Sequence, residues 1–158
     1  MVYRGGIAPR LVFVGEAPGA EEDRQGRPFV GRSGRILDAA IADLGLEEAD
    51  VGILNVLKCR PPQNRFDPAA ARTCRPYLDR QLELLRPRVV IPLGASALKA
   101  LDPASPPVLR AAGTLRGGRE PPLFPLVHPA ASLRSARLRA RWQADLAALS
   151  AWLRTRPF

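Results

Sequence analysis

The sequence is poor in several residue types, and each shortage excludes a class of protein. Its 158 residues include two cysteines, one histidine and only two lysines, Lys58 and Lys99. Two cysteines are too few for the disulfide framework of a small secreted protein. No apolar run approaches the ~20 residues of a membrane span, and the first ten residues lack the apolar core of a signal peptide. We therefore expect a cytoplasmic protein with no membrane partner.

The length suits one domain with a sizeable core. The composition, 46% hydrophobic and 25% charged, is that of a globular protein. Neither an internal repeat nor a linker divides the chain, and each half is too small to stand alone. We expect a single domain over residues 1–158.

The formal net charge of +9 comes almost entirely from arginine. It is uneven, because residues 110–158 contain nine arginines and two acidic residues, a net of +7. A one-sided basic surface suits a polyanionic partner, and arginine makes bidentate contacts with phosphate. A GC-rich genome explains the abundance of arginine equally well, so the charge alone does not decide the function.

Short apolar runs alternate with helical patterns along the chain. Strands are expected at residues 11–14, 51–57, 89–93 and 123–127, and helices at 33–44, 69–86, 94–101 and 134–153. Residues 115–120 suit an added edge strand or a turn. Strands that are apolar on both faces and alternate with helices predict an α/β fold with a parallel sheet covered on both sides.

Polar residues follow the predicted strands at their carboxyl ends, where open parallel sheets bind ligands. Glu16 follows the first strand, Asn55 stands at the end of the second, and His128 follows the fourth. An asparagine amide offers an acceptor and two donors side by side, which suits the N–H and carbonyl edge of uracil or thymine. A histidine can donate a hydrogen bond to an oxygen where negative charge develops. These residues could hold a pyrimidine and stabilise it as a departing anion.

The stretch GEAPGAEEDRQGRPFVG, residues 15–31, places Phe29 in a polar, glycine-rich loop. It matches neither the dinucleotide fingerprint nor the P-loop, because no Gly-Lys-Ser/Thr follows. An aromatic ring there offers a stacking face for a flat heterocycle rather than a core contact. Structural interpretations stay open: Asn55 as a strand cap, Phe29 as a core residue, His128 as a turn residue and residues 21–23 as a solvated acidic run.

Several segments together resemble the successive motifs of the uracil-DNA glycosylase superfamily, in particular its family 4 of thermophiles and other bacteria. They are GEAPGAEEDRQGRPFVGRSG, NVLKCRPPQNR, a cysteine fifteen residues after Cys59, and HPAASLR. The resemblance runs from about Leu11 to Trp152. It implies a three-layer α/β/α sandwich around a four-stranded parallel sheet. It also implies hydrolysis of the N-glycosidic bond of deoxyuridine in DNA, which releases uracil and leaves an abasic site.

The resemblance further implies roles for the strand-end residues. Phe29 would stack on the uracil, Asn55 would read its Watson–Crick edge, and His128 would bond the O2 side and favour the uracil anion. The transition state has cationic character on the sugar and negative charge on the base, so a carboxylate and a histidine suit its two halves.

The same resemblance extends the site to the residues around it. The motif at Glu16 and Ala17 would hold the attacking water and offer a backbone N–H near O2. Glu22 matches another active-site acid of the family, and Asn64 would help to order the pocket. Whether Glu16 acts as a base or only orients water stays open.

The base must leave the DNA stack before it can react, and an apolar side chain commonly fills the gap. The family places its DNA-inserting loop after the motif histidine, which makes Leu133 the expected wedge. Arg134, Arg137, Arg139 and Arg141 are expected to hold phosphates. The alternative is that Leu133 packs against the sheet and these arginines form a solvated helix face.

Family 4 enzymes carry a [4Fe–4S] cluster on four cysteines, and Cys59 and Cys74 match the downstream pair. The upstream C-x-x-C would precede Val2 and is absent from this sequence. A cluster normally needs four thiolates. Three interpretations stay open: a truncated chain, a lost cluster with two free thiols, or a cluster shared between two chains. The cofactor is therefore in doubt, whereas the pocket residues are unaffected.

Three functions compete for these residues. An unrelated nucleotide-binding α/β protein needs a phosphate motif that is absent. A catalytically weak member of the same superfamily, binding DNA or damaged bases, would differ at Glu16, Asn55 or His128, and all three are present. We therefore predict a monomeric glycosylase that acts on uracil-containing DNA in base excision repair.

Overall fold

The sheet is built from four strands in the order β1-β3-β2-β4 in this computed structural model, which describes residues 3–156. Strands β2 (Leu11–Gly15), β3 (Val51–Asn55) and β4 (Val89–Pro92) are parallel. Strand β1 (Arg4–Gly5) pairs antiparallel with β3 and was not expected. The α/β fold with a four-stranded sheet is confirmed, but the sheet is mostly rather than wholly parallel.

The expected strand at residues 123–127 runs beside β4 without forming a regular strand. Two isolated parallel bridges join it to the β4 region, and one antiparallel bridge joins it to residues 115–120. Pro92 of β4 has no N–H to donate to the Phe124 carbonyl oxygen, so one bond is missing from the hydrogen-bond ladder between this segment and β4. The segment still delivers His128 to the edge where β2, β3 and β4 end.

The helices agree broadly with the sequence pattern. They are α1 (Ala20–Gln25), α2 (Arg32–Asp43), α3 (Pro68–Leu85), α4 (Ala95–Leu101), α5 (Val108–Ala111) and α6 (Ala136–Thr155), with short 3₁₀ turns η1 (Glu48–Asp50), η2 (Pro62–Asn64) and η3 (Pro129–Leu133). Helices α1 and α5 were not expected, since both are short. The last helix starts later than expected, because Ser135 caps α6 by accepting a hydrogen bond from the Leu138 N–H at 3.2 Å.

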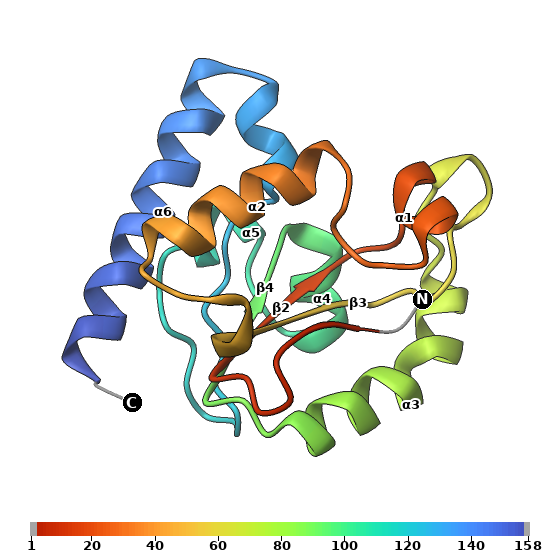
Figure 1. Cartoon of the computed structure of the whole chain (residues 1–158), viewed down its shortest axis with the longest axis horizontal. Coiled ribbons are helices and arrows are strands. Elements are labelled where there is room, and N and C mark those ends of the chain that lie inside the picture. Colours follow the sequence, from red (N-terminus) through yellow and green to blue (C-terminus); the bar gives the residue numbers. More distant parts are fainter. Residues whose placement is uncertain (1–2, 157–158) are drawn as a thin grey trace.

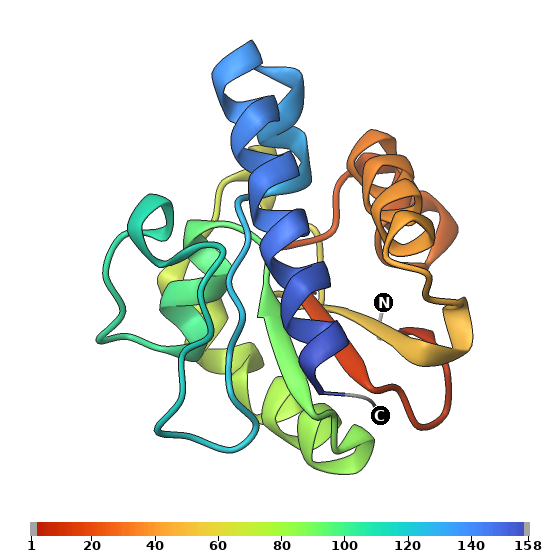
Figure 2. The ribbon, with the colours of Figure 1, turned by 90° about the vertical axis from the view of Figure 1, so that its left-hand side faces the viewer.

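The side chains of β2 alternate between two apolar cores, one on each face of the sheet. Leu11 and Phe13 pack with residues of α2 and α6, whereas Val12 and Val14 pack with residues of α3 and α4. Figures 1 and 2 show these two helix pairs on opposite sides of the strands. Full burial of each such side chain contributes about 1.5–3 kcal/mol, so the strands form a firm base for the polar residues at their carboxyl ends.

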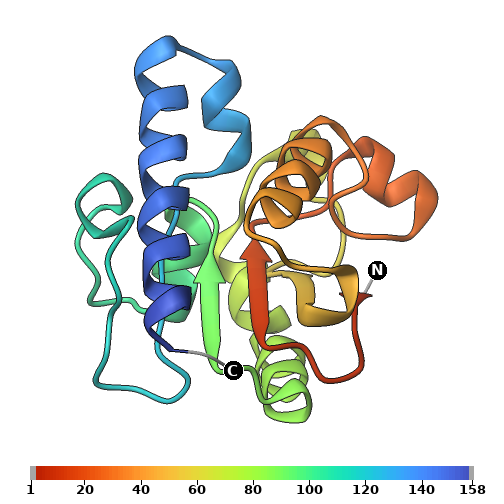
Figure 3. The same cartoon turned by 60° about the vertical axis from the view of Figure 1, so that its left-hand side comes forward.

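The carboxyl ends of the parallel strands define the functional edge of the molecule. In Figure 3 the arrowheads of β2 and β4 point the same way, and η3 and the α1–α2 region stand beyond them. Within residues 3–156, no helix combines the length and the hydropathy that a membrane crossing requires.

Candidate active site

Gly15, the last residue of β2, is where the predicted site residues meet. A Cβ atom on Gly15 would lie 2.5 Å from the Phe29 ring and 2.6 Å from the Asn55 Oδ1. The ring centroids of Phe29 and His128 are 6.1 Å apart, with their planes inclined by 30°. The fold therefore brings three residues from distant parts of the sequence to one point at the edge of the sheet.

Replacing Gly15 with alanine tests this close approach. Both neighbouring groups are held by the surrounding fold, so the added methyl group displaces them instead of being absorbed. We expect a loss of about 1–3 kcal/mol in the free energy of unfolding, the usual cost of overpacking, together with weaker substrate binding. Urea denaturation and the KM for a deoxyuridine strand measure the two effects. A variant with wild-type stability and KM would contradict the packing described here.

Asn55 presents an unsatisfied acceptor inside the protein. Its side chain is 5% exposed, and Oδ1 is buried without a hydrogen-bond partner within the described residues. An unpaired buried polar atom costs about 1–3 kcal/mol, which a ligand N–H would recover. The observation favours a binding role over the strand-cap interpretation.

Lys58 fixes the main chain beneath Asn55 and was not anticipated from the sequence. Its Nζ donates to the Asn55 carbonyl oxygen at 2.6 Å and to the Gln81 Oε1 at 2.6 Å. Burial lowers the pKa of Lys58 to about 8, partly opposed by the nearby Cys74 thiol. The residue ties the end of β3 to α3, so the Asn55 side chain projects from a rigid base.

His128 is held in one tautomer. Its Nδ1 accepts a hydrogen bond from the Ala130 N–H at 3.1 Å, so in the neutral ring the proton sits on Nε2. Burial lowers the pKa of His128, opposed by the Glu16 carboxylate and reinforced by Arg134. The ring is therefore neutral at pH 7 and offers Nε2–H as a donor.

Glu16 borders a cavity on the same edge of the sheet. The cavity has a volume of about 320 Å³, and its lining includes Glu16, Ser96, His128 and Arg134. The Ser96 hydroxyl donates to Glu16 Oε2 at 2.6 Å, which orients the carboxylate. Ser96 was missed in the sequence analysis, although it lies just beyond the third strand, at the edge where ligands were expected.

The Phe29 loop holds an unusual backbone conformation. Phe29 has φ = +54°, in the left-handed region, and its carbonyl oxygen accepts a hydrogen bond from Arg4 Nη1 at 2.9 Å. The ring is 6% exposed and belongs to the core on the α2–α6 face, so the expectation that it avoids the core is wrong. A left-handed non-glycine residue costs about 1–3 kcal/mol and persists only where its surroundings fix it.

Glu22 makes hydrogen bonds that hold the Phe29 loop in this conformation. Its Oε1 accepts from the N–H groups of Val30 and Gly31 at 3.0 and 2.8 Å, and its Oε2 accepts from the Gly19 N–H at 3.1 Å. Charge-assisted bonds of this kind are stronger than neutral ones. Both oxygens of Glu22 therefore serve the main chain of the loop, and its contact with substrate stays a prediction.

Two other predicted residues lie at the margin. Ala17 follows Glu16, is partly buried, and its N–H makes no hydrogen bond within the described residues. Asn64 is exposed in η2, where its Oδ1 accepts from Arg60 Nε at 2.8 Å. Among the described residues no hydrogen bond joins Asn64 to Asn55 or His128, so its role in ordering the pocket stays a prediction.

Leu133 and the arginines after it lie beside the site. Leu133 is 47% exposed, so it is not packed against the sheet. Arg134, Arg137 and Arg139 are exposed, and their side chains form no hydrogen bond or ion pair within residues 3–156. They stay candidates for phosphate contact.

Arg141 does not belong to this exposed set, so its assignment to phosphate was wrong. Its Nε pairs with the buried Asp145 Oδ1 at 2.7 Å. Its Nη1 and Nη2 donate to the carbonyl oxygens of Leu109 and Ala112 at 2.7 and 2.9 Å. The guanidinium is fully engaged in tying α6 to α5.

The cysteines do not provide a cluster site on their own. Cys59 is exposed, Cys74 is partly buried, and both are free thiols. Within the part of the chain that is described, no group of three or more His, Cys, Asp or Glu side chains could hold a metal ion. The described residues thus fit two of the four thiolates that a [4Fe–4S] cluster requires, and no catalytic step is assigned to the cluster.

The fold and site define an α/β protein with a ligand pocket beyond the carboxyl ends of parallel strands. Residues 2–150 match the family described as the uracil DNA glycosylase superfamily. The chain belongs to this superfamily, as its motifs led us to expect.

Relatives with curated names point to one branch of the superfamily. A type-4 uracil-DNA glycosylase of Archaeoglobus fulgidus is 41% identical over 150 residues, covering 89% of this chain and 75% of that protein. One from Pyrobaculum aerophilum is 42% identical over 146 residues, covering 87% and 74%. A type-5 uracil-DNA glycosylase of Thermus thermophilus is 35% identical but covers only 58% of this chain and 49% of that protein.

Proposed function

We propose that this protein hydrolyses the N-glycosidic bond of deoxyuridine in DNA, releasing uracil and leaving an abasic site for base excision repair. The observation that carries the proposal is the buried, unpaired Oδ1 of Asn55 beside an aromatic ring and a neutral imidazole. The names of the type-4 relatives support the same activity. The enzyme acts in the cytoplasm, as a monomer.

The base is recognised by complementary hydrogen bonds. Asn55 Oδ1 accepts from the N3–H of uracil, while its amide donates to the adjacent carbonyl O4. Phe29 offers its ring to the face of the base. A site that satisfies a buried polar group in this way discriminates strongly against bases with a different edge.

The departing base is stabilised by fixed donors. As the C1′–N1 bond breaks, its electron pair leaves with the uracil, and negative charge builds on O2. His128 Nε2–H donates to that oxygen, and the Ala17 N–H supports it. Because the imidazole is already neutral and oriented by Ala130, little reorganisation is needed in the transition state.

Glu16 acts on the sugar side of the bond. Its Oε2 is taken by Ser96, which leaves Oε1 to accept a proton from the attacking water. The water oxygen bonds to C1′ as the uracil anion leaves. The carboxylate also stabilises the cationic sugar of the transition state.

The deoxyuridine must leave the base stack of the DNA before it can enter the site. Leu133 fills the gap left by the flipped base, and Arg134, Arg137 and Arg139 hold phosphates beside it. Glu22 supports this site indirectly, by fixing the loop that carries Phe29.

The decisive experiment uses a short single-stranded oligonucleotide with one deoxyuridine, and a matched strand with deoxycytidine, whose base presents the opposite hydrogen-bonding edge, in its place. Incubation followed by alkali should cut the first strand at the uracil position and leave the second intact. Binding without cleavage would instead identify a catalytically weak member of the superfamily. Failure to bind either strand would refute both functions.

A further inference from the structure

Some arginines of α2, of α6 and at the end of η3 form no ion pair within residues 3–156. Elsewhere many arginines have acidic partners, as in the pairs Arg4–Asp38, Arg10–Asp50, Arg75–Asp79, Arg80–Glu83, Arg116–Asp102 and Arg141–Asp145. The side chains of Arg32 and Arg35, in the first turn of α2, form no hydrogen bond or ion pair within residues 3–156, although Arg35 lies close enough to Glu21 to help lower its pKa. Arg134 directly follows η3, and Arg137 and Arg139 lie at the start of α6.

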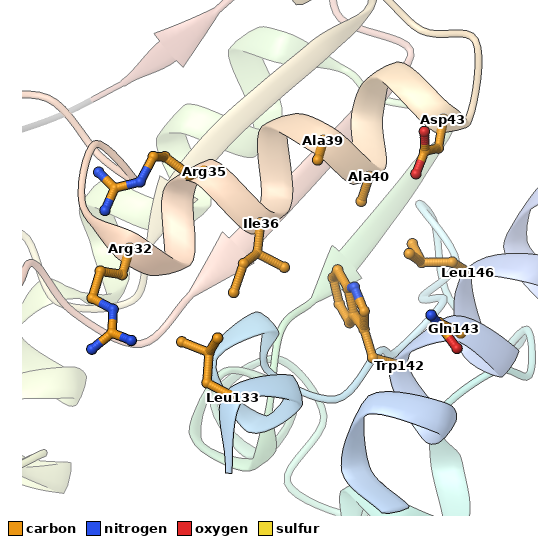
Figure 4. A pocket seen from close by; sticks show the side chains of 10 residues that line it. All are labelled: Arg32, Arg35, Ile36, Ala39, Ala40, Asp43, Leu133, Trp142, Gln143 and Leu146. Atoms are coloured by element: carbon orange, nitrogen blue, oxygen red, sulfur yellow. The ribbon is translucent and has the colours of Figure 1, made fainter. Parts of the chain in front are cut away.

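A groove of about 450 Å³ separates α2 from η3 and α6. Figure 4 shows Arg32 and Arg35 at one end of it and Asp43 at the other. Its lining between these ends is largely apolar: Ile36, Ala39, Ala40, Leu133, Trp142 and Leu146, with the polar Gln143 beside them. The groove is separate from the cavity that Glu16 and His128 line.

The orientation of the Leu133 side chain links the groove to the proposed flipping of the base. Its side chain and that of Ile36 point toward one another across the groove (Figure 4). If Leu133 inserts between bases, the nucleotides next to the flipped one lie within reach of this groove, because Leu133 lines it. Arg32 directly follows Gly31, the residue whose N–H is held with the Phe29 loop, so the arginine end of the groove is the end nearest the uracil site.

We propose that this groove holds the stretch of DNA strand next to the flipped nucleotide, with Arg32 and Arg35 on its phosphates. The inference rests on the proposed function and adds α2 to the binding surface, a role that the resemblance did not assign to Arg32 or Arg35. Guanidinium groups suit phosphate, and apolar side chains along a basic groove suit unstacked bases. Trp142 is only 5% exposed, so the bases meet Ile36, Leu133 and Leu146 instead.

The length of the groove limits the number of nucleotides that it can hold. The 12 residues of α2 extend about 18 Å at 1.5 Å per residue. This length equals about five nucleotides at the stacked spacing of 3.4 Å, so a strand with unstacked, more extended nucleotides fits fewer than five. Asp43 closes the far end by repelling phosphate. The strand therefore gains from flanking nucleotides on one side of the uracil over a short distance only.

The test compares Arg32→Ala/Arg35→Ala with Arg110→Ala/Arg154→Ala, which removes the same charge outside the groove. Fluorescence anisotropy measures binding of a labelled single strand containing deoxyuridine over a range of salt concentrations. For the groove variant we expect binding about tenfold weaker, and a slope of log K against log salt that is shallower by about 1.4, since each single-strand phosphate contact contributes about 0.7. The control should keep the wild-type slope.

A second test measures how binding changes when the strand is shortened on one side of the uracil. Removing groove-side nucleotides should weaken binding by the wild type more than binding by the groove variant, which keeps the apolar contacts but has lost the phosphate contacts. Equal slopes for the two variants, or equal sensitivity to shortening, would overturn the groove assignment. Because binding is measured independently of cleavage, absence of uracil release would refute the proposed function without deciding the groove.

Discussion

Asn55→Ala is expected to lower the rate of uracil release by about 10²–10³-fold, the usual cost of removing one fixed hydrogen-bonding group from a transition state. The wild-type Oδ1 is buried and unpaired, so it is already desolvated before substrate arrives, and the uracil N3–H would supply its missing hydrogen bond. The measurement is the single-turnover rate of release from a deoxyuridine strand at saturating enzyme. An Asn55→Ala protein with the wild-type rate would remove Asn55 from the site.

Asn55→Asp is the matched control for this prediction, because it keeps size and shape while the amide donors become acceptors. We expect it to lose activity as well, since a carboxylate repels the carbonyl O4 of uracil. Both variants should stay folded, because Lys58 holds the Asn55 main-chain carbonyl rather than its side chain. A melting temperature well below that of the wild type would mean that the lost activity reflects unfolding.

Much of the fold could be predicted from apolar patterns. The three parallel strands are continuous buried runs, and the sequence located them to within a residue or two. Strand β1 escaped prediction because two residues carry no periodicity, and α1 because its AEEDRQ sequence has no apolar face. The segment before His128 was expected to be a full strand, and Pro92 of β4 interrupts its pairing.

The site could be predicted only where topology dictates it. Glu16, Asn55 and His128 were expected together because parallel strands end at one edge. The supporting contacts could not be foreseen, since Arg4 reaches the Phe29 carbonyl and Ser96 reaches Glu16 across long stretches of sequence.

The substitution His128→Asn separates two roles of the histidine. Nδ1 accepts a hydrogen bond from the Ala130 N–H in the η3 turn, and Nε2–H is proposed to donate to the departing base. Asparagine can still accept the Ala130 N–H through its side-chain oxygen, as Asn does at helix N-caps, but it does not extend to the position of Nε2. We therefore expect the η3 turn to persist while uracil release falls by about 10²–10³-fold. Single-turnover rates measure the loss, and the melting temperature reports on the turn. A His128→Asn protein that releases uracil at the wild-type rate would show that Nε2–H does not stabilise the departing base.

The pH dependence of uracil release and of stability provides an independent test of the role of His128. Burial lowers the pKa of His128 below its ordinary 6.5, so the ring stays neutral, and the enzyme keeps its activity, as the pH falls through 6.5. Further acidification protonates Nδ1, which can then no longer accept from Ala130. Because the folded pKa is the lower one, the stability that neutral His128 contributes is complete above pH 6.5 and is lost as the pH falls through the folded value. On acidification the wild-type melting temperature should therefore begin to fall near pH 6.5, where the unfolded chain takes up its proton, and the release rate should fall at the lower pH where the folded ring is protonated. His128→Asn should lack this part of the decline in stability. An activity loss centred on pH 6.5 or above would contradict a buried, neutral His128.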